Sequence, residues 1–401
     1  MYKPTISDIV KNMPDSGIKD FFDVANSLDG ALSLGVGEPD FATPEHIRDA
    51  AVASIRRADT KYTDNRGTVE LRQAVAEYLE KFDLHYHGSD EVLITMGASE
   101  GIDLALRTLI NPGDEVLVTE PCYVSYEPCV ELCGGTVVAV GTKASDRFRL
   151  TTAGLLEKIT EKTKVLLMSF PNNPTGAIME KEDLEAVAEI VKAHDIFVIS
   201  DEIYAELTYG KKHISIASLP GMAERTLVLN GFSKAFAMTG WRLGFAAGPK
   251  DVIFYMNKIH QFTTMSAGTT SQYAALEALK NPVREAKLGH MRAEYDKRRE
   301  RMVRGFLEMG LDVAVPEGAF YVFPSVASLG MSSQEFCKRL LEEQKVAVIP
   351  GDAFGPCGEG YVRCSYAYSE DVICKCLEKI AVFVREVQQF RQDALLPNVR
   401  R

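Results

Sequence analysis

Five short segments of the chain carry residue types that can support covalent and anion-binding chemistry. They are GAS (97–99), FPNNPTG (170–176), SDEIY (200–204), GFSKAFAMTGWRLG (231–244) and YVRCSY (361–366). A lysine amine such as Lys234 can condense with an aldehyde, a carboxylate such as Asp201 favours a nearby cation, and the planar fork of Arg363 fits a carboxylate. Taken alone, each segment also has an ordinary explanation as a turn, a helix cap or a solvated charge.

The elements around these segments predict a sheet that brings them together. Between about residues 90 and 250, short apolar runs alternate with helical patterns such as KEDLEAVAEIVKAH (181–194), which indicates a mainly parallel sheet flanked by helices. Such sheets bind ligands at the carboxyl ends of their strands, where the polar residues stand. The expected strands cover 92–95, 115–120, 136–140, 164–170, 196–202, 226–231 and 243–248.

The last third of the chain predicts a second lobe. A long charged helical stretch follows Asn281 and leads to a strand at Phe320–Phe323, a helix at 332–344, the YVRCSY strand and a final helix. This mixture is of the α+β type. The sequence contains no repeat, low-complexity tract or long flexible linker, so we expect the two lobes to pack together.

In order and spacing, the five segments resemble the class I and II aminotransferases of the fold type I pyridoxal-phosphate enzymes. The most specific pieces are NPTG (173–176), the D-x-x-Y of Asp201 and Tyr204, and S-K-x-x-x-M-T-G-W-R-x-G beginning at Ser233. The resemblance covers nearly the whole chain. It implies an α/β fold with a seven-stranded large domain (46–285), a smaller α+β domain (286–401) and an N-terminal arm (1–45) that joins the small domain.

The resemblance gives Lys234 and Asp201 the central catalytic roles. Lys234 would carry pyridoxal 5'-phosphate as a Schiff base and then, as a free amine beside the substrate Cα, move the proton as base and acid. Asp201 would face the pyridine nitrogen and keep it protonated, which makes the ring an electron sink. Asn173 and Tyr204 would hydrogen-bond the phenolic oxygen of the ring, and Tyr123 would stack on its face.

The cofactor phosphate requires a positive site in an otherwise acidic protein. Ala98 and Ser99 open an expected helix, whose N–H groups and dipole favour an anion. Ser233 and Arg242 resemble the family's side-chain donors to the phosphate. Tyr62, in KYTDNRG, resembles the tyrosine that reaches the phosphate of a neighbouring subunit, so the resemblance implies a homodimer with shared active sites.

The substrate contacts follow from the same resemblance. Arg363 matches the arginine that binds the substrate α-carboxylate, Asn173 belongs beside the substrate as well, and Gly37 in LGVGEPDF matches a loop that approaches the same carboxylate. GVGEPD lacks the third glycine of a dinucleotide fingerprint and does not open a βαβ unit, which excludes a nicotinamide site. The N-terminal segment SGIKDFFDVANSL (16–28) resembles a subgroup that includes aromatic, aspartate and N-acetyl-diaminopimelate aminotransferases, and it places Ile18 near the side-chain pocket.

These roles imply reversible transfer of an amino group between an L-amino acid and a 2-oxo acid, in two half-reactions through pyridoxamine phosphate. A carbon–sulfur β-lyase on the same scaffold also begins with Cα deprotonation, and the cofactor motifs do not separate the two. A non-catalytic pyridoxal-phosphate-binding regulator is disfavoured because Lys234, Asp201, Arg242 and Arg363 are all present. The choice among acidic, aromatic and acylated diamino acid substrates stays open.

Composition limits the remaining classes of function. The 401 residues carry a net charge of −11 with a pI near 5.3, which argues against nucleic acid or anionic membrane as partners. There is no apolar leader and no apolar run of membrane-spanning length, so we expect a cytoplasmic protein. The eight cysteines are dispersed, which indicates buried or free thiols and not disulfides, and no CxxC or HExxH pattern suggests a metal.

Overall fold

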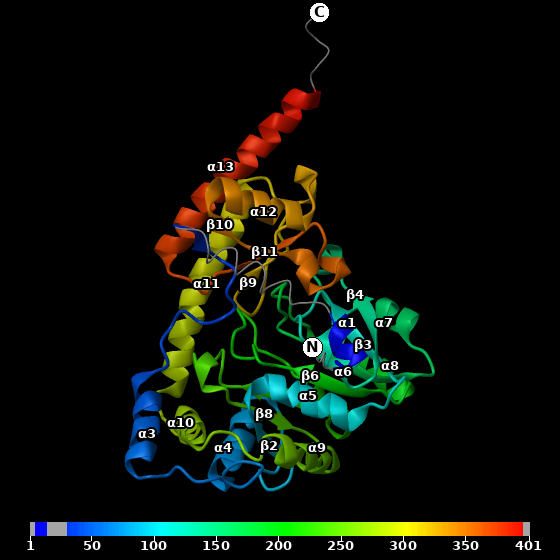
Figure 1. The fold of residues 1–401 in the computed structure, drawn as a ribbon, viewed down its shortest axis with the longest axis vertical. Coiled ribbons are helices and arrows are strands. Elements are labelled where there is room, and N and C mark those ends of the chain that lie inside the picture. The colour runs from blue at the N-terminus through cyan, green and yellow to red at the C-terminus, as the bar shows by residue number, and fades with distance from the viewer. Residues whose placement is uncertain (1–4, 14–29, 396–401) are drawn as a thin grey trace, which may run out of the picture.

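The computed structural model describes residues 5–13 and 30–395, and its centre is a seven-stranded sheet (Figure 1). The strand order is β2-β8-β7-β6-β5-β3-β4. All neighbouring strands pair in parallel except β8, which runs antiparallel to both β2 and β7. The strands are β2 (Val92–Thr95), β3 (Glu115–Glu120), β4 (Thr136–Gly141), β5 (Thr163–Ser169), β6 (Phe197–Asp201), β7 (Thr226–Gly231) and β8 (Gly244–Ala247). The predicted mainly parallel sheet is confirmed.

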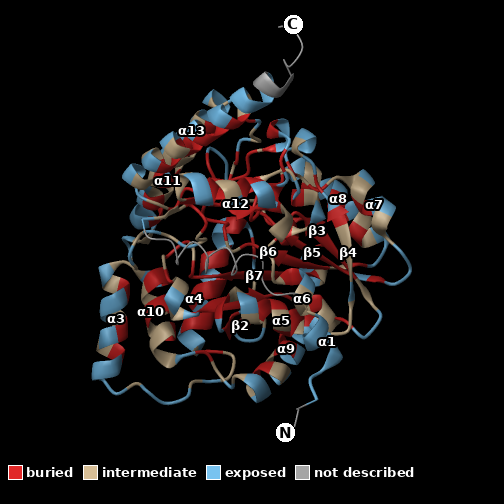
Figure 2. Cartoon of the chain, turned by 45° about the horizontal axis from the view of Figure 1, so that its top comes forward, coloured by how far each residue is buried: buried red, intermediate tan, exposed pale blue. Residues whose placement is uncertain are grey.

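The sheet is covered by helices on both faces, because alternate residues of each strand point to opposite sides. Leu93 of β2 packs with helices α5 and α9, whereas its neighbours Val92 and Ile94 pack with α4 and α10. Leu117 and Val198 meet α8 and the region of α7. Figure 2 shows the central strands of the sheet buried and the outer faces of the helices exposed, and the edge strand β4 is mostly half-buried. The helices are α3 (Glu45–Arg56), α4 (Val69–Leu79), α5 (Gly97–Leu109), α6 (Tyr126–Leu132), α7 (Thr152–Lys158), α8 (Lys181–Ala193), α9 (Lys250–Thr263) and α10 (Thr269–Lys280).

The second lobe is built around two small sheets and the long helix α11. One sheet has the order β11-β12-β9 and is antiparallel, and in the other β1 pairs in parallel with β10. The strand β1 comes from the N-terminal side of the chain, so this segment belongs to the second lobe by its hydrogen bonds. The elements are β1 (Leu32–Ser33), α11 (Arg284–Glu308), β9 (Tyr321–Val322), α12 (Ser333–Gln344), β10 (Val346–Ala347), β11 (Ile349–Pro350), β12 (Val362–Ser365) and α13 (Glu370–Leu395).

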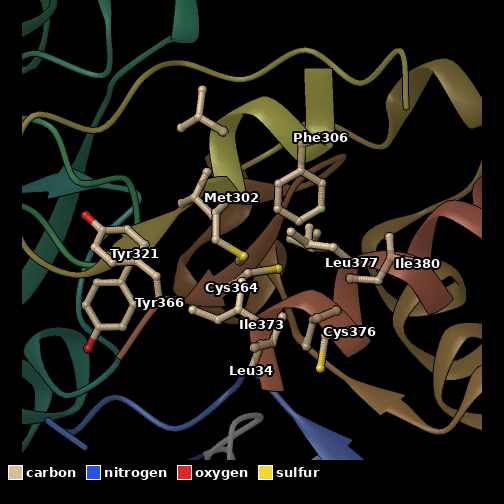
Figure 3. Close-up of a cluster of buried hydrophobic side chains, with 14 of the residues drawn as sticks. Leu34, Met302, Phe306, Tyr321, Cys364, Tyr366, Ile373, Cys376, Leu377 and Ile380 are labelled. Atoms are coloured by element: carbon tan, nitrogen blue, oxygen red, sulfur yellow. The ribbon is translucent and has the colours of Figure 1, made fainter. Parts of the chain in front are cut away.

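A continuous apolar core holds the second lobe together. Met302 and Phe306 of α11 pack in one cluster with Ile373 and Leu377 of α13 and with Cys364 of β12 (Figure 3). Tyr321 lies at the edge of this cluster that faces the large sheet (Figure 3). The lobe therefore supplies a rigid wall opposite the carboxyl ends of the sheet strands.

The remaining elements are short. Helix α1 spans Asp8–Asn12, and single 3₁₀ turns connect the larger elements. These turns are η1 (Glu80–Phe82), η2 (Ala144–Asp146), η3 (Ile216–Ser218), η4 (Ala223–Arg225), η5 (Thr239–Trp241), η6 (Ala327–Leu329), η7 (Gly351–Phe354) and η8 (Pro356–Gly358).

Candidate active site

A cavity of about 300 Å³ lies where the ends of the sheet strands face the second lobe. It brings together all of the sequence-predicted site residues except Tyr62 and Ile18. The cavity is lined by Gly37, Ala98, Ser99, Ile102, Tyr123, Tyr126, Ser169, Asn173, Asp201, Ile203, Tyr204, Ser233, Lys234, Thr239, Arg242, Tyr321 and Arg363.

Lys234 stands on the loop between β7 and β8. Its Nζ donates to the carbonyl oxygen of Gly37 at 2.7 Å and lies 5.9 Å from the ring centre of Phe320. Burial lowers the pKa of Lys234 to about 8, with Arg363 and Arg242 lowering it further and Glu38 opposing them. The neutral, nucleophilic amine is therefore accessible near physiological pH.

Asp201 ends β6 with its carboxylate inside the cavity. Its Oδ2 accepts a hydrogen bond from the Tyr126 hydroxyl at 2.7 Å, and its Oδ1 accepts one from the Ile203 N–H at 3.1 Å. Burial raises the pKa of Asp201, while these two hydrogen bonds act in the opposite direction. A buried carboxylate with this limited set of donors favours a cationic partner in the cavity.

Tyr126 was missed by the sequence analysis. It begins α6 with no exposed surface, so its residue type and position resemble an ordinary core tyrosine. Its hydroxyl reaches Asp201 because the segment after β3 turns back over the ends of the strands. The PCYVSY segment contains two tyrosines, and only Tyr123 was assigned to the site.

Arg363, in β12, enters the cavity from the second lobe. Its Nη1 donates to Asn173 Oδ1 at 2.9 Å and its Nη2 to the Gly35 carbonyl oxygen at 2.6 Å. The guanidinium carbon lies 4.6 Å from the ring centre of Tyr321 and 4.7 Å from that of Phe354. The Nε atom is buried and has no hydrogen-bond partner among residues 5–13 and 30–395. The Arg363 guanidinium is held in one orientation and is incompletely hydrogen-bonded, so it suits a carboxylate ligand.

The start of α5 and the side chain of Arg242 form an anion cradle. Gly97 has φ +74°, and a Cβ there would lie 2.8 Å from Arg242 Nη2. A Cβ on Gly244 would lie 2.5 Å from the backbone nitrogen of Ala98. Glycine at both positions lets the guanidinium and the β8 backbone approach the first turn of the helix, whose N–H groups have no acceptor within the helix. With Ser233 beside it, this corner suits a phosphate.

Tyr204 and Tyr321 connect the two lobes inside the cavity. Their hydroxyl groups are 2.8 Å apart, and the Tyr204 ring meets the Phe320 ring edge-on at 5.3 Å between centroids. A Cβ on Gly37 would lie 2.5 Å from Tyr321 Oη, so glycine allows the close approach of that loop. Tyr321 was missed because it lies in the apolar run AFYVF, which indicated only a buried strand.

The other lining residues complete the walls. Tyr123 is partly buried and meets Tyr126 edge-on, with ring centroids 5.6 Å apart. Ile102, Ser169, Ile203 and Thr239 also line the cavity without having been predicted. They stand next to predicted segments, and nothing in their residue types distinguishes them from packing residues.

Two predicted residues are not placed in this cavity. Tyr62 is 81% exposed in the single chain, on a segment tied to the region after α9 by the Asn65 Nδ2 hydrogen bond to the Met265 carbonyl at 2.7 Å. Ile18 lies outside the described residues.

Residues 5–13 and 30–395 show no sign of a metal site or of a membrane-spanning helix. No cluster of three or more histidine, cysteine, aspartate or glutamate side chains there has an arrangement that could hold a metal ion. No helix in those ranges combines the length and apolarity needed to cross a membrane.

Similarity to known proteins identifies the family of this chain and fits the residues that line the cavity. The family model for aminotransferase class I and II matches residues 29–380, so the chain belongs to this family and is an aminotransferase. The putative aminotransferase YugH of Bacillus subtilis is 48% identical, covering 95% of this chain and 98% of its own. The probable N-acetyl-LL-diaminopimelate aminotransferase of Bacillus subtilis is 43% identical, over 94% of this chain and 95% of its own.

Solved structures extend the comparison to the fold. The aspartate aminotransferase of Thermus thermophilus with maleate has a TM-score of 0.91 at 38% identity, over 95% of this chain and 100% of its own. The aromatic aminotransferase of Pyrococcus horikoshii has a TM-score of 0.88 at 42% identity, over 92% of this chain and 99% of its own. The α/β fold of the type I aminotransferases is confirmed.

Proposed function

We propose that this aminotransferase uses pyridoxal 5'-phosphate and moves an amino group between an L-amino acid and a 2-oxo acid. The observation that carries the proposal is the Lys234 amine, with its lowered pKa, in one cavity with Asp201, Arg363 and the anion cradle at α5. When bound, the cofactor supplies an aldehyde for amine exchange and a ring that accepts electrons from the substrate. The carboxylate, the amine and the cradle fit the ring nitrogen, the aldehyde and the phosphate of that group.

The residues of the large lobe would hold the cofactor. The N–H groups of Ala98 and Ser99, the Ser233 hydroxyl and the Arg242 guanidinium bind the phosphate. Asp201, oriented by Tyr126, holds a proton on the ring nitrogen.

The phenolic oxygen and the face of the cofactor ring are assigned to different side chains. Asn173 and Tyr204 donate to the phenolic oxygen, and Tyr123 stacks on the ring.

Lys234 has two tasks in this proposal. Its amine is the point of covalent attachment, and once released it takes the proton from the substrate α-carbon and returns it during the other half of the reaction. Burial supports both tasks, because it leaves a substantial fraction of the amine unprotonated near pH 8, where an exposed lysine is almost fully charged.

Substrate binding is assigned to the second lobe and the loop that faces it. Arg363 binds the α-carboxylate, with Asn173 and the backbone at Gly37 beside it. Ile18 is proposed to lie near the substrate side chain. Relatives are named for aspartate, aromatic amino acids and N-acetyl-LL-diaminopimelate, and these classes are the donors to test first.

A homodimer is part of the proposal, because Tyr62 is assigned to the phosphate of the neighbouring subunit. Exposed apolar side chains at the end of α9 and just after it support this assignment. Phe262 is 84% exposed, and Met265, whose carbonyl accepts from Asn65, is 43% exposed. Exposed apolar side chains grouped in this way are typical of a protein interface.

The test is amino transfer by purified protein from a panel of amino acid donors to several 2-oxo acids. Lys234→Ala should lower the rate by several orders of magnitude, since attachment point and proton carrier are lost together. Lys162→Ala, at an exposed lysine outside the cavity, is the matched control and should retain the wild-type rate. Full activity of Lys234→Ala would refute the mechanism, and pyruvate release from cystathionine without an added oxo acid would instead indicate the β-lyase.

A further inference from the structure

Glu202, the residue after Asp201, is a buried carboxylate outside the cavity. Its side chain is 2% exposed and accepts from Ser200 Oγ at 2.9 Å and Ser215 Oγ at 2.6 Å, both on Oε1. Its Oε2 lies 2.8 Å from His213 Nε2. Each oxygen of the carboxylate is therefore held by a side chain of the protein.

A carboxylate in this position requires an explanation other than packing. Desolvation of an ion and its partner costs more than most buried pairs return, and apolar residues of the same volume commonly stabilise a fold as well or better. The His213 ring is itself fixed, meeting the Phe82 ring edge-on with centroids 5.6 Å apart.

The geometry connects Glu202 directly to the active-site carboxylate. Side chains alternate along a strand, so Ser200 and Glu202 lie on one side of the end of β6 while Asp201 enters the cavity on the other. The Glu202 N–H donates to the Leu229 carbonyl at 2.8 Å, and the Ala205 N–H donates to the Glu202 carbonyl at 2.9 Å. The side-chain hydrogen bonds of Glu202 therefore restrain the short stretch of backbone from which Asp201 and Tyr204 extend.

We infer that Glu202 is a positioning residue whose hydrogen bonds to Ser200, Ser215 and His213 hold Asp201 at the cofactor ring nitrogen. The inference rests on the proposed function, in which Asp201 faces that nitrogen. Glu202 touches neither substrate nor cofactor and acts through the shared backbone.

Glu206, on the same segment, offers a matched control. It is also buried, with a side chain 4% exposed, and it accepts from the Tyr78 hydroxyl and the Lys81 amine, each at 2.7 Å. It lies after Tyr204, four residues further from Asp201 along the chain. Its removal should perturb a buried carboxylate of the same segment and leave Asp201 in place.

The experiment uses holoenzyme loaded with cofactor labelled with ¹⁵N at the ring nitrogen, together with hydrogen exchange at the amides of residues 202–205. Glu202→Ala should speed exchange at Ile203 and Ala205 and move the nitrogen signal toward the unprotonated value seen in Asp201→Asn. The dissociation constant of the cofactor should rise roughly tenfold or more, as for loss of the outer-shell partners of metal ligands. Glu202→Gln should leave all three readouts close to the wild-type values, because the amide oxygen can accept from both serines and the amide nitrogen can donate to His213 Nε2 when that ring nitrogen carries no hydrogen.

The outcomes separate the inference from the function on which it rests. Glu202→Ala with an unchanged nitrogen signal, while Asp201→Asn moves it, would overturn the inference and leave the proposed function standing. An unmoved signal in Asp201→Asn would overturn the proposed function itself. The same shift in Glu206→Ala would show a general softening of the segment and would also overturn the inference.

One variant covers the case in which Glu202→Ala does not fold. Ser215→Ala removes a single donor from Glu202 and should change the same readouts in the same direction, with roughly a threefold or greater effect on cofactor affinity. No change in that variant would overturn the inference as well.

Discussion

Replacing Arg363 by lysine should weaken the reaction of amino acids without weakening the reaction of amines that lack a carboxylate. The substitution retains the positive charge and removes the fork, of which Nη1 and Nη2 already contact Asn173 and Gly35. A lysine ammonium can satisfy only part of this arrangement, so about one charge-assisted hydrogen bond to the substrate is lost, worth about 1.5–3 kcal/mol. We therefore expect kcat/KM for the amino acid to fall roughly ten- to a hundredfold.

The assay is the rate of the first half-reaction as a function of substrate concentration, for an amino acid and for the amine formed by removing its carboxyl group. Arg149→Lys is the control, since Arg149 pairs with Glu180 and Glu317 outside the cavity and its loss tests a general effect of removing a guanidinium. An equal loss with both substrates would show that Arg363 supports the structure of the site and does not bind the carboxylate. An unchanged rate with the amino acid would refute the assignment entirely.

Three further predictions concern Lys234, Asp201 and Tyr62. Burial lowers the pKa of Lys234 from 10.5 to about 8, so between these values the unfolded chain binds a proton that the folded chain does not. The free energy of unfolding of cofactor-free protein should rise with pH across that window by up to about 3 kcal/mol more than in Lys234→Met, and urea denaturation giving equal slopes would contradict this. Asp201→Ala should retain some cofactor and slow the half-reaction strongly, with little change in the denaturation midpoint. Unchanged half-reaction rates would show that Asp201 does not face the ring nitrogen. Mixing Tyr62→Phe with Lys234→Ala should give heterodimers in which one site binds cofactor roughly tenfold tighter than Tyr62→Phe alone, whereas no gain after verified subunit exchange would place Tyr62 outside the neighbouring site.

Most of the large lobe could be predicted from the sequence because its strands, apart from the edge strand β4, are buried on both faces. A strand of this kind is an uninterrupted apolar run with polar residues at its end, and the runs from Val92 to Ala247 have this form. The direction of β8 was not predicted, since an apolar run has the same appearance in either direction. Its reversal comes from the connection after β7, which returns directly to the neighbouring position in the sheet.

Candidate site residues could be predicted where a charged side chain stands at the end of a buried strand. They could not be predicted where the residue is of a type that is common in protein cores. Lys234 and Asp201 are charged residues next to apolar runs, so the sequence alone distinguishes them from packing residues. Tyr126 and Tyr321 have 0% and 1% exposure, and their hydroxyl partners come from segments distant in the chain. Tyr62 and Ile18 remain predictions, because Tyr62 depends on a second chain and Ile18 lies outside the described residues.

The connection between β7 and β8 has a consequence for engineering. Ser233, Lys234 and Arg242 all come from this one loop, which is closed by the pairing of Gly231 with Gly244. A Cβ on Gly231 would lie 2.9 Å from the Gly244 Cα, so neither glycine can be exchanged without moving the loop ends. Residues 231–244 therefore form a cassette that should be transplanted between relatives whole. Variant libraries that aim to change which amino acids the enzyme accepts should keep the cassette constant. They should vary the opposite wall of the cavity, where Gly37 and Arg363, the residues proposed to bind substrate, belong to other parts of the chain.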